Sequence, residues 1–357
     1  MNKNELLKGN IAIAKTALNC GCSCYFGYPI TPQTEIGEYL SIKMQEKGLA
    51  YVCAESEIGA INMALGAAST GARVMVSSSS CAVALMQETI SYAASDELPL
   101  VLVNVMRAGP GQGYIYPSQG DYNQATVGGG NGDYKTIVLS PSTVQECIDM
   151  TYKAFYLSQK YRIPTILLLD GLLGQMAEPA NLKENPYPII NNSSWNLTGA
   201  KNRTSRNIHS LEPNAQKLYE HIKKLEEKHQ QIEKNETDWD EYLCKDADYI
   251  ITAFGSLGRI AKSVCNHYRD IGYNFGVFRP KTLYPFPSER LYQLSQKTKN
   301  IFNIEMNLGQ MYSDIQKSIS SNAKITLIAK PAGEWLKEEE IIQEINKVLQ
   351  GQYATNI

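Results

Sequence analysis

Short apolar runs alternate with helical patterns through the first 170 residues, and this alternation restricts the fold more than any other feature of the chain. The runs are apolar at consecutive positions, which predicts strands covered on both faces and hence a parallel sheet with helical crossovers. We expect strands at residues 22–26, 50–54, 73–77, 100–105, 136–139 and 165–169. Helical spacing predicts helices between them at residues 57–70, 81–94 and 143–159.

The pattern changes after Asp170. Residues 180–210 are rich in Asn, Ser and Pro without a sustained period, which indicates an irregular connector. Residues 215–240 are strongly charged and predict one amphipathic helix, with apolar residues at helical spacing at Leu218, Ile222, Leu225 and Ile232. A second alternating block predicts strands at 248–253, 275–278, 300–304 and 325–328, and helices at 257–269, 288–296 and from 337. We therefore expect an α/β protein divided into residues 1–180, a connector at 181–245 and a smaller doubly wound domain at 246–357.

Charge and hydropathy exclude two classes of partner. The 34 basic and 36 acidic residues give a net charge of −2, which offers no basic footprint for nucleic acid. No apolar run approaches the ~18 residues that span a bilayer, and the N-terminal stretch has no apolar signal core. We expect a soluble, cytoplasmic protein without nucleic acid or membrane partners.

Cysteine and histidine usage narrows the chemistry further. The spacing of Cys20, Cys22 and Cys24 does not match a metal or iron–sulfur clip, so we expect small, reduced thiols and no metal site on this chain. A redox role for these three thiols stays open. All four histidines lie after residue 200, which argues against a Ser-His hydrolase in the first domain.

Polar residues collect where the predicted strands end. An open parallel sheet places its ligand crevice at that edge, so residues 28–31, Glu55, Glu57, residues 77–80 and residues 107–119 are candidate site residues. Pro29 and Pro32 stiffen the first of these loops. Two interpretations stay open from the residues alone, because Ser, Thr and Glu also favour helix starts. Thr31 could cap a helix that begins at Pro32 instead of meeting a ligand.

Five stretches occur in an order that resembles the alpha subunit of thiamine-dependent 2-oxoacid:ferredoxin oxidoreductases. They are GYPITPQTEI at 27–36, AESEIGAINMALGAASTGARVMVSSSS at 54–80, ELPLVLVNVMRAGPGQG at 97–113, PSQGDYNQAT at 117–126 and DGLLGQMAEP at 170–179. ADYIITAFGSLGRIAKSV and VFRPKTLYPFP resemble that family's transketolase C-terminal-type domain more loosely. The resemblance implies a thiamine diphosphate-binding fold with a pyrimidine-type domain, followed by a smaller transketolase C-terminal-like domain.

The resemblance also implies roles for single residues. Thr31 is similar to the family threonine that meets the substrate carboxylate, with Tyr28 and Pro29 of the same loop beside the cofactor. The S-E-x-G-A pattern selects Glu57 over Glu55 as the glutamate that hydrogen-bonds N1′ of the aminopyrimidine, so that C2 of the cofactor can lose its proton.

Three further residues belong to the implied substrate site. Arg107 is similar to the family arginine that faces the carboxylate or carbonyl of the substrate, which a guanidinium can grip with two parallel donors. Gln119 and Asp121 are expected to line the same crevice.

Two pieces of such an enzyme are missing from the sequence. A G-D-G segment with a downstream asparagine, which holds Mg²⁺ and the diphosphate, is not found, and neither is a ferredoxin-type cysteine set. The resemblance implies that a beta subunit brings the diphosphate and Mg²⁺ site, while gamma and ferredoxin-like subunits bring the iron–sulfur clusters. We expect the isolated chain to be inactive and a homo-oligomer or prone to aggregate. Its tyrosine-rich loops are the expected partner surface, at Tyr114, Tyr116, Tyr122 and Tyr134.

The substrate is expected to be a branched-chain 2-oxoacid. The stretch at 106–134 looks most like the type that converts 3-methyl-2-oxobutanoate and CoA into acyl-CoA, CO₂ and reduced ferredoxin. The alternative is a 2-oxoglutarate enzyme, which needs a second cation for the distal carboxylate, and Lys135 or Arg73 could serve only by pointing inward. A non-catalytic scaffold subunit and a CoA-independent thiamine decarboxylase are the remaining interpretations.

Overall fold

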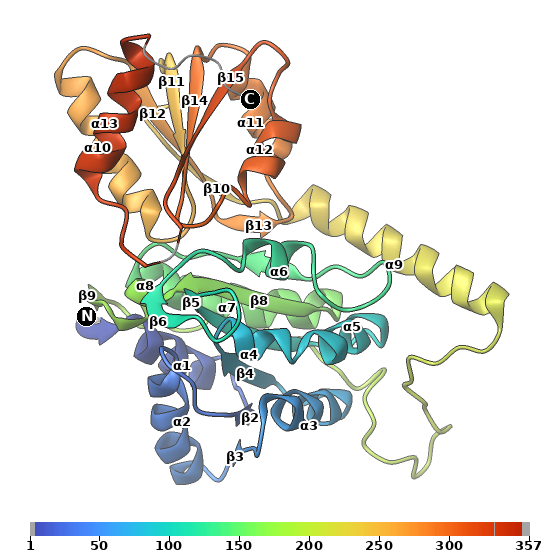
Figure 1. Cartoon of the computed structure of the whole chain (residues 1–357). Coiled ribbons are helices and arrows are strands. Elements are labelled where there is room, and N and C mark those ends of the chain that lie inside the picture. The colour runs from blue at the N-terminus through green and yellow to red at the C-terminus, as the bar shows by residue number, and fades with distance from the viewer. Residues whose placement is uncertain (1–3, 332, 352–357) are drawn as a thin grey trace.

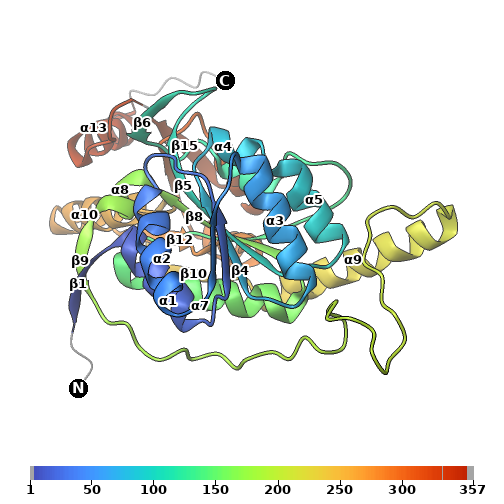
Figure 2. The ribbon, with the colours of Figure 1, turned by 90° about the horizontal axis from the view of Figure 1, so that it is seen from below.

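The computed structural model describes residues 4–331 and 333–351 as two α/β units stacked on one another, with a long helix projecting beside them (Figure 1). The projecting helix is α9 (Ala215–Asn235). The chain reaches it through residues 181–214, which run without regular structure along one side of the first unit, at the lower edge of the view in Figure 2.

A mostly parallel sheet forms the centre of the first unit. Its strands are β2 (Cys24–Gly27), β3 (Ala50–Cys53), β4 (Val74–Ser78), β5 (Leu100–Ala108), β7 (Ile137–Leu139), β8 (Pro164–Asp170) and β13 (Thr282–Tyr284). The order across the sheet is β13-β7-β8-β5-β4-β2-β3, with only β13 antiparallel to its neighbour. A short strand, β6 (Tyr114–Pro117), folds back antiparallel onto the end of β5. Every predicted strand of this domain is present.

Side chains of β5 show why the sheet is buried on both faces. Val101, Val103 and Val105 pack on one face against α1 (Gly9–Asn19), α2 (Thr34–Glu46) and α7 (Val144–Tyr161). Leu100, Leu102 and Met106 pack on the other face with α3 (Glu57–Ser69) and α5 (Gln87–Ser95). The consecutive apolar residues of each strand therefore follow from a two-sided core.

The second unit is a smaller sheet with helices on both faces. Its strands, β10 (Trp239–Tyr242), β11 (Tyr249–Thr252), β12 (Phe275–Pro280), β14 (Asn300–Glu305) and β15 (Lys324–Ala329), lie in the order β10-β12-β11-β14-β15. One face carries α10 (Leu257–Asp270) and α13 (Glu338–Leu349). The other face carries α11 (Ser288–Ser295) and α12 (Tyr312–Ser318), and its apolar core is continuous with that of the first unit.

Short elements complete the fold. In the first unit they are α4 (Cys81–Ala84), α6 (Tyr122–Thr126), α8 (Gly171–Gln175) and an antiparallel pair of strands, β1 (Glu5–Lys8) with β9 (Ala177–Ala180). None of the helices in the described part of the chain is long and apolar enough to cross a membrane.

Two helix predictions were wrong in detail. The helix expected at 81–94 is divided into α4 and α5, because Leu85 and Met86 form a turn with i to i−3 hydrogen bonds. The helix expected at 215–240 ends at Asn235, because the chain turns into β10 and the carbonyl of Asp238 accepts hydrogen bonds from the backbone of Lys281 and Thr282.

Strand β13 links the two units. Its residues belong to the second half of the chain but pair with β7 at the edge of the first sheet, whereas β10 joins the second sheet. The division at residues 180 and 245 stays a prediction.

Candidate active site

The predicted crevice lies at the carboxyl edge of the first sheet. Strands β3, β2, β4 and β5 are adjacent and parallel, so the segments that follow them meet at one edge. The chain passes from β2 to β3 on one side and returns to β4 on the other, which makes β2 the topological switch point. We use the name crevice for the segments at this edge, which are residues 28–33, the start of α3, Ser80 and Arg107.

The loop at residues 28–33 is held through its backbone carbonyls. Asn10 Nδ2 and Gln175 Nε2 both donate to the carbonyl of Pro32, at 2.8 and 2.9 Å. Gln33 Nε2 donates to the carbonyl of Tyr28 at 3.2 Å. Because these bonds use the backbone, the side chains at the tip of the loop stay available for a ligand.

Thr31 lies at that tip with an exposed side chain that makes no hydrogen bond within the described structure. Helix α2 begins at Thr34, and its N-cap Gln33 makes no side-chain capping bond. The alternative that Thr31 caps a helix beginning at Pro32 is therefore wrong.

Arg107, at the end of β5, is a cation with little solvent around it. Its side chain is 9% exposed, and Nη1 donates to the carbonyl of Thr31 at 3.3 Å. Nη2 lies 2.9 Å from the carbonyl of Gln112 and 3.1 Å from Cys81 Sγ. Nε is buried without a partner. The guanidinium therefore joins the β2 loop to the β5–β6 turn and retains a donor for an anion.

Glu57 is the first residue of α3 and is only 8% exposed. Its carboxylate makes no hydrogen bond or ion pair with any described residue. Capping of α3 falls to its neighbours, since Ser56 Oγ accepts from the N–H of Gly59 at 3.1 Å and the Glu55 carboxylate lies against Gly59. Of the two glutamates, Glu57 is the less exposed one, and its carboxylate has no partner among the described residues.

Gln119 does not line the crevice as expected. It is fully buried, Nε2 donates to the carbonyl of Phe254 at 2.8 Å, and Oε1 accepts from the N–H of Met306 at 3.2 Å. Both ends of its amide are used by the second unit, so we drop it as a substrate contact.

Asp121 stabilises the crevice through hydrogen bonds to Ser80 and Asn104. Its Oδ2 accepts from Ser80 Oγ at 2.6 Å and from Asn104 Nδ2 at 3.0 Å. Burial raises the pKa of the Asp121 carboxyl above its usual range, although both hydrogen bonds act to lower it. Both hydrogen bonds use one carboxylate oxygen, and they tie Asp121 to Ser80 and Asn104.

The three clustered cysteines lie away from the crevice. Cys20 and Cys22 are buried before β2, and burial raises the pKa of the Cys22 thiol to about 12, so it stays protonated at neutral pH. Within residues 4–331 and 333–351, no group of three or more His, Cys, Asp or Glu side chains is arranged to hold a metal ion.

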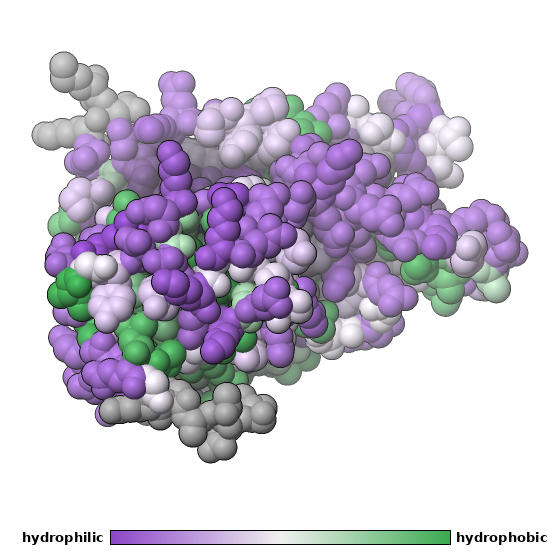
Figure 3. All heavy atoms as spheres, turned by 90° about the horizontal axis from the view of Figure 1, so that it is seen from above, coloured by the Kyte–Doolittle hydropathy of each residue, from purple (hydrophilic) through white to green (hydrophobic). Residues whose placement is uncertain are grey.

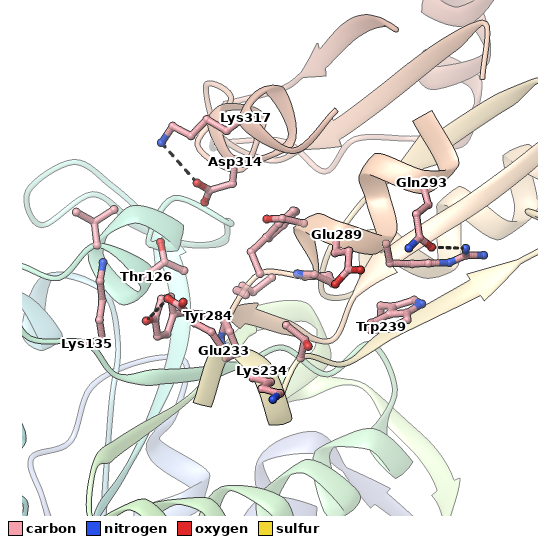
Figure 4. A pocket seen from close by; sticks show the side chains of 18 residues that line it. Thr126, Lys135, Glu233, Lys234, Trp239, Tyr284, Glu289, Gln293, Asp314 and Lys317 are labelled. Atoms are coloured by element: carbon pink, nitrogen blue, oxygen red, sulfur yellow. Dashed lines mark hydrogen bonds and ion pairs between the residues drawn. The ribbon is translucent and has the colours of Figure 1, made fainter. Parts of the chain in front are cut away.

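A separate hollow of about 940 Å³ lies between α9, α11 and the end of α6 (Figure 4). Charges of both signs line it, and Tyr284 OH donates to Glu233 at 2.9 Å while Lys135 Nζ lies 5.3 Å from the Tyr284 ring. Thr31, Glu57 and Arg107 are not among its lining residues. The hollow is distinct from the crevice.

Apolar side chains are exposed on the elements that border the crevice. They are Tyr28, Val52, Ile58, Leu85, Tyr114, Ile115 and Tyr116, each at least 36% exposed. Seen from above, most of the molecular surface is hydrophilic, and hydrophobic residues gather toward the lower left of the view (Figure 3). A set of this kind at a ligand-binding edge is typical of a protein interface.

Two of the four tyrosines expected on that surface are buried instead. Tyr122 packs against Phe254 and donates its hydroxyl proton to Asp314 at 2.7 Å. Tyr134 is 9% exposed and accepts from the N–H of Gly130 at 3.1 Å. Both tyrosines stabilise this chain, and the sequence held no signal that separates them from Tyr114 and Tyr116.

Comparison with known families matches almost the whole chain. Residues 15–242 match the family described as pyruvate flavodoxin/ferredoxin oxidoreductase, thiamine diphosphate-binding, and residues 247–341 match core domain II of pyruvate:ferredoxin oxidoreductase.

Curated relatives span the chain from end to end. Ketoisovalerate oxidoreductase subunit VorB of Methanothermobacter thermautotrophicus is 42% identical over 344 residues, which cover 96% of this chain and 97% of the relative. The 2-oxoglutarate synthase subunit KorA of Methanocaldococcus jannaschii is 34% identical over 370 residues, covering 95% of this chain and 98% of the relative.

Two solved structures share the fold. The chain superposes with a TM-score of 0.85 and 24% identity on 2-oxoglutarate:ferredoxin oxidoreductase from Magnetococcus marinus, covering 97% of this chain and 65% of that one. A split-gene transketolase matches with a TM-score of 0.57 and 12% identity, covering 96% of both chains. With the family matches and the identity to the curated relatives, these comparisons lead to one conclusion: the chain is an oxidoreductase subunit of the thiamine diphosphate-binding pyruvate flavodoxin/ferredoxin oxidoreductase family.

Proposed function

We propose that this chain is the alpha subunit of a 2-oxoacid:ferredoxin oxidoreductase that decarboxylates a branched-chain 2-oxoacid, 3-methyl-2-oxobutanoate, and transfers the acyl group to CoA. The observation that carries the proposal is the placement of Glu57, which is only 8% exposed and has no partner among the described residues, and of the hydrogen-bonded Arg107 and Thr31 at the same edge of one sheet. A scaffold subunit has no physical reason to keep these three side chains at one edge of the sheet.

Arg107 and Thr31 are the proposed contacts of the substrate carboxylate. The free Nε of Arg107 and the unbonded hydroxyl of Thr31 are donors, and a carboxylate accepts from both kinds of group. The contact between Arg107 Nη1 and the Thr31 carbonyl keeps the two residues together before the substrate arrives.

Glu57 fits the pyrimidine end of thiamine diphosphate. Its carboxylate can hold or share a proton with a ring nitrogen, and burial strengthens that interaction. Two further buried groups without partners, Ser78 Oγ and Ser79 Oγ, lie at the same edge. Tyr28 and Pro29, both exposed on the β2 loop, are proposed to pack beside the cofactor. When bound, thiamine diphosphate supplies the electron sink for decarboxylation.

Partner subunits complete the proposed enzyme. The curated relatives are named as subunits. We assign the Mg²⁺ and diphosphate site to a beta subunit, and the iron–sulfur clusters that reduce ferredoxin to gamma and ferredoxin-like subunits. The exposed apolar side chains around the crevice support burial of this edge against such a partner.

Three observations favour the branched-chain substrate over 2-oxoglutarate. The identity to the VorB relative is 42%, against 34% to the KorA relative. Arg73 precedes β4, at the opposite edge of the sheet, and its guanidinium donates to the carbonyl of Cys20. Lys135 precedes β7 and lies over the ring of Tyr284. Neither candidate for a second cation therefore faces the crevice.

A steady-state assay of the assembled complex tests the proposal. The complex is supplied with CoA, ferredoxin or a viologen dye, and either 3-methyl-2-oxobutanoate or 2-oxoglutarate. We expect kcat/KM to be at least about 10-fold higher for the branched-chain acid, because a polar distal carboxylate would enter the site unpaired. A preference for 2-oxoglutarate would overturn the substrate assignment, and product formation without CoA would identify a decarboxylase instead.

A further inference from the structure

The segment at residues 118–123 is held by the second unit. The side chain of Asn307 donates to the carbonyl of Gln119 at 2.9 Å, and Gln310 Nε2 donates to the carbonyl of Gly120 at 2.7 Å. Gln310 Oε1 accepts from the N–H of Asn123 at 2.8 Å. Because these bonds reach the backbone on both sides of Asp121, the second unit sets the position of that residue.

Asp121 in turn reaches back into the first unit. Its Oδ2 is the shared acceptor of Ser80 Oγ at 2.6 Å and Asn104 Nδ2 at 3.0 Å. Asn104 Oδ1 then accepts from the N–H of Ser80 at 3.0 Å. The Asn104 amide therefore holds the backbone N–H of Ser80, and the Asp121 carboxylate holds its hydroxyl group.

Ser80 needs this support because its backbone is strained. Its φ of 35° lies in a region that residues other than glycine rarely adopt and that persists only when the surroundings impose it. Its Oγ lies 2.9 Å from the N–H of Arg107 and 3.1 Å from the carbonyl of Arg107. Any relaxation of Ser80 therefore shifts the backbone from which the Arg107 guanidinium projects.

We propose that Asp121 is a positioning residue, and that the contacts from Asn307 and Gln310 through Asp121 and Ser80 allow the second unit to fix Arg107 in the crevice. In this role, Asp121 accepts hydrogen bonds from Ser80 and Asn104 and does not contact the substrate. The inference rests on the proposed function, in which Arg107 binds the 2-oxoacid carboxylate.

The decisive comparison is Asp121→Asn against Asp121→Ala in the assembled complex. The amide oxygen of asparagine can still accept from Ser80 and Asn104. Alanine removes the acceptor, so Asn104 Nδ2 loses its partner and the Ser80 hydroxyl keeps only its contacts with the backbone of Arg107. We expect D121A to raise the KM for the oxoacid about 10-fold or more, and D121N to stay within about three-fold of wild type. A residue that acts on the substrate through its charge would lose as much in D121N as in D121A.

The second unit provides an independent variant. Gln310→Ala substitutes no residue of the crevice itself, and we expect it to raise the same KM, with a loss that is not additive with that of D121A. Gln293→Ala is the matched control, because Gln293 is an exposed amide on α11 whose side chain contacts Arg290. We expect it to leave KM unchanged.

Hydrogen exchange provides a readout that needs no turnover. Backbone amides at residues 104–113 should exchange faster in D121A and Q310A and normally in D121N and Q293A. Equal impairment of D121N and D121A, additive losses, or unchanged exchange would overturn the inference. If D121A does not assemble, Q310A decides, since an unchanged KM there also overturns it. A preference for 2-oxoglutarate would overturn only the proposed substrate, and the variants would then be compared with that acid.

Discussion

Glu57 and Arg107 are both ionisable residues with less than a tenth of their surface exposed, yet neither is neutralised by an opposite charge among the described residues. Burying such groups costs free energy. A protein keeps them in spite of that cost where a ligand or a partner uses them. The two side chains therefore distinguish this edge of the sheet from the rest of the surface. Two predictions belong to this scale.

Replacing Glu57 by glutamine should lower turnover of the complex by about 100-fold or more, because an amide cannot share a proton with the aminopyrimidine nitrogen. Assembly and melting temperature should not change. The measurement is turnover together with hydrogen–deuterium exchange at C2 of the bound cofactor. Glu55→Gln, two residues earlier on the exposed side, is the control, and normal exchange in E57Q would remove Glu57 from the mechanism.

Replacing Thr31 by valine should raise the KM for the oxoacid with little effect on cofactor affinity. One lost hydrogen bond to a charged group is worth about 1–2 kcal/mol, or roughly 5- to 30-fold. Thr34→Val, at the start of α2, is the matched control. An unchanged KM in the T31V complex would mean that its exposed hydroxyl does not meet the substrate.

At the scale of single elements, α9 is the one that depends most on electrostatics for its place. Its first turns project from the molecule, and within α9 only Leu225 and Ile232 are fully buried. Glu97 anchors it through ion pairs with Lys224 and with Lys228, the latter at 2.5 Å. The side chain of Glu97 is 11% exposed, so this pair is screened less than a surface pair.

Replacing Glu97 by glutamine should destabilise the docking of α9. Burial acts to raise the pKa of Glu97, but the ammonium groups of Lys228 and Lys224 outweigh it and lower that pKa to about 2. A depressed carboxyl pKa stabilises the folded state above the unfolded pKa of about 4.5, and that stabilisation is lost as pH falls from 4.5 toward 2. After discounting for solvent screening, we expect about 1–2 kcal/mol at neutral pH.

Chemical denaturation of wild type and E97Q across pH checks this expectation. The two curves should differ at pH 7 and converge in strong acid. Glu226→Gln is the control, because Glu226 pairs with Lys223 on the exposed face of the same helix. A difference between wild type and E97Q that persists in acid would rule out the charge of Glu97 as the cause.

For the whole molecule, the two units form one body with a shared core, and some of its exposed apolar side chains lie beside the crevice. Tyr114, Ile115 and Tyr116 are consecutive residues of β6, and all three are more than half exposed. A strand exposed on both faces gains stability only when a partner covers it. This surface is therefore the proposed beginning of the interface with the beta subunit, which should bury about 2,000 Å² or more.

The isolated chain should show no measurable affinity for thiamine diphosphate and Mg²⁺. It should form homo-oligomers or aggregate. The physical reason is that this chain holds only the pyrimidine end of the proposed site. Titration calorimetry with and without the beta subunit, together with size-exclusion chromatography, checks the expectation. Tight cofactor binding and oxoacid oxidation by the 357-residue chain alone would contradict the shared site.

The strands, the crossover helices and the residues at the strand ends could be predicted from the sequence. Apolar runs and helical spacing are local signals, and the carboxyl end of a parallel strand is a local position, so the segments that contain Thr31, Glu57 and Arg107 could be placed at one edge of the sheet. The roles of these three residues came from the family resemblance and stay predictions. The choice of Glu57 over Glu55 came from a motif and stays a prediction.

By itself, the sequence determined an α/β chain with parallel strands and a polar edge, because periodicity is set by neighbours within a few residues. Only the tertiary structure decided that Gln119 serves the second unit, that Asp121 braces Ser80, that Tyr122 is buried and that β13 closes the first sheet. These outcomes depend on partners far along the chain; Gln119 and Phe254 are 135 residues apart. A long-range contact depends on how two surfaces pack. A short stretch of sequence does not specify which distant residues it will pack against.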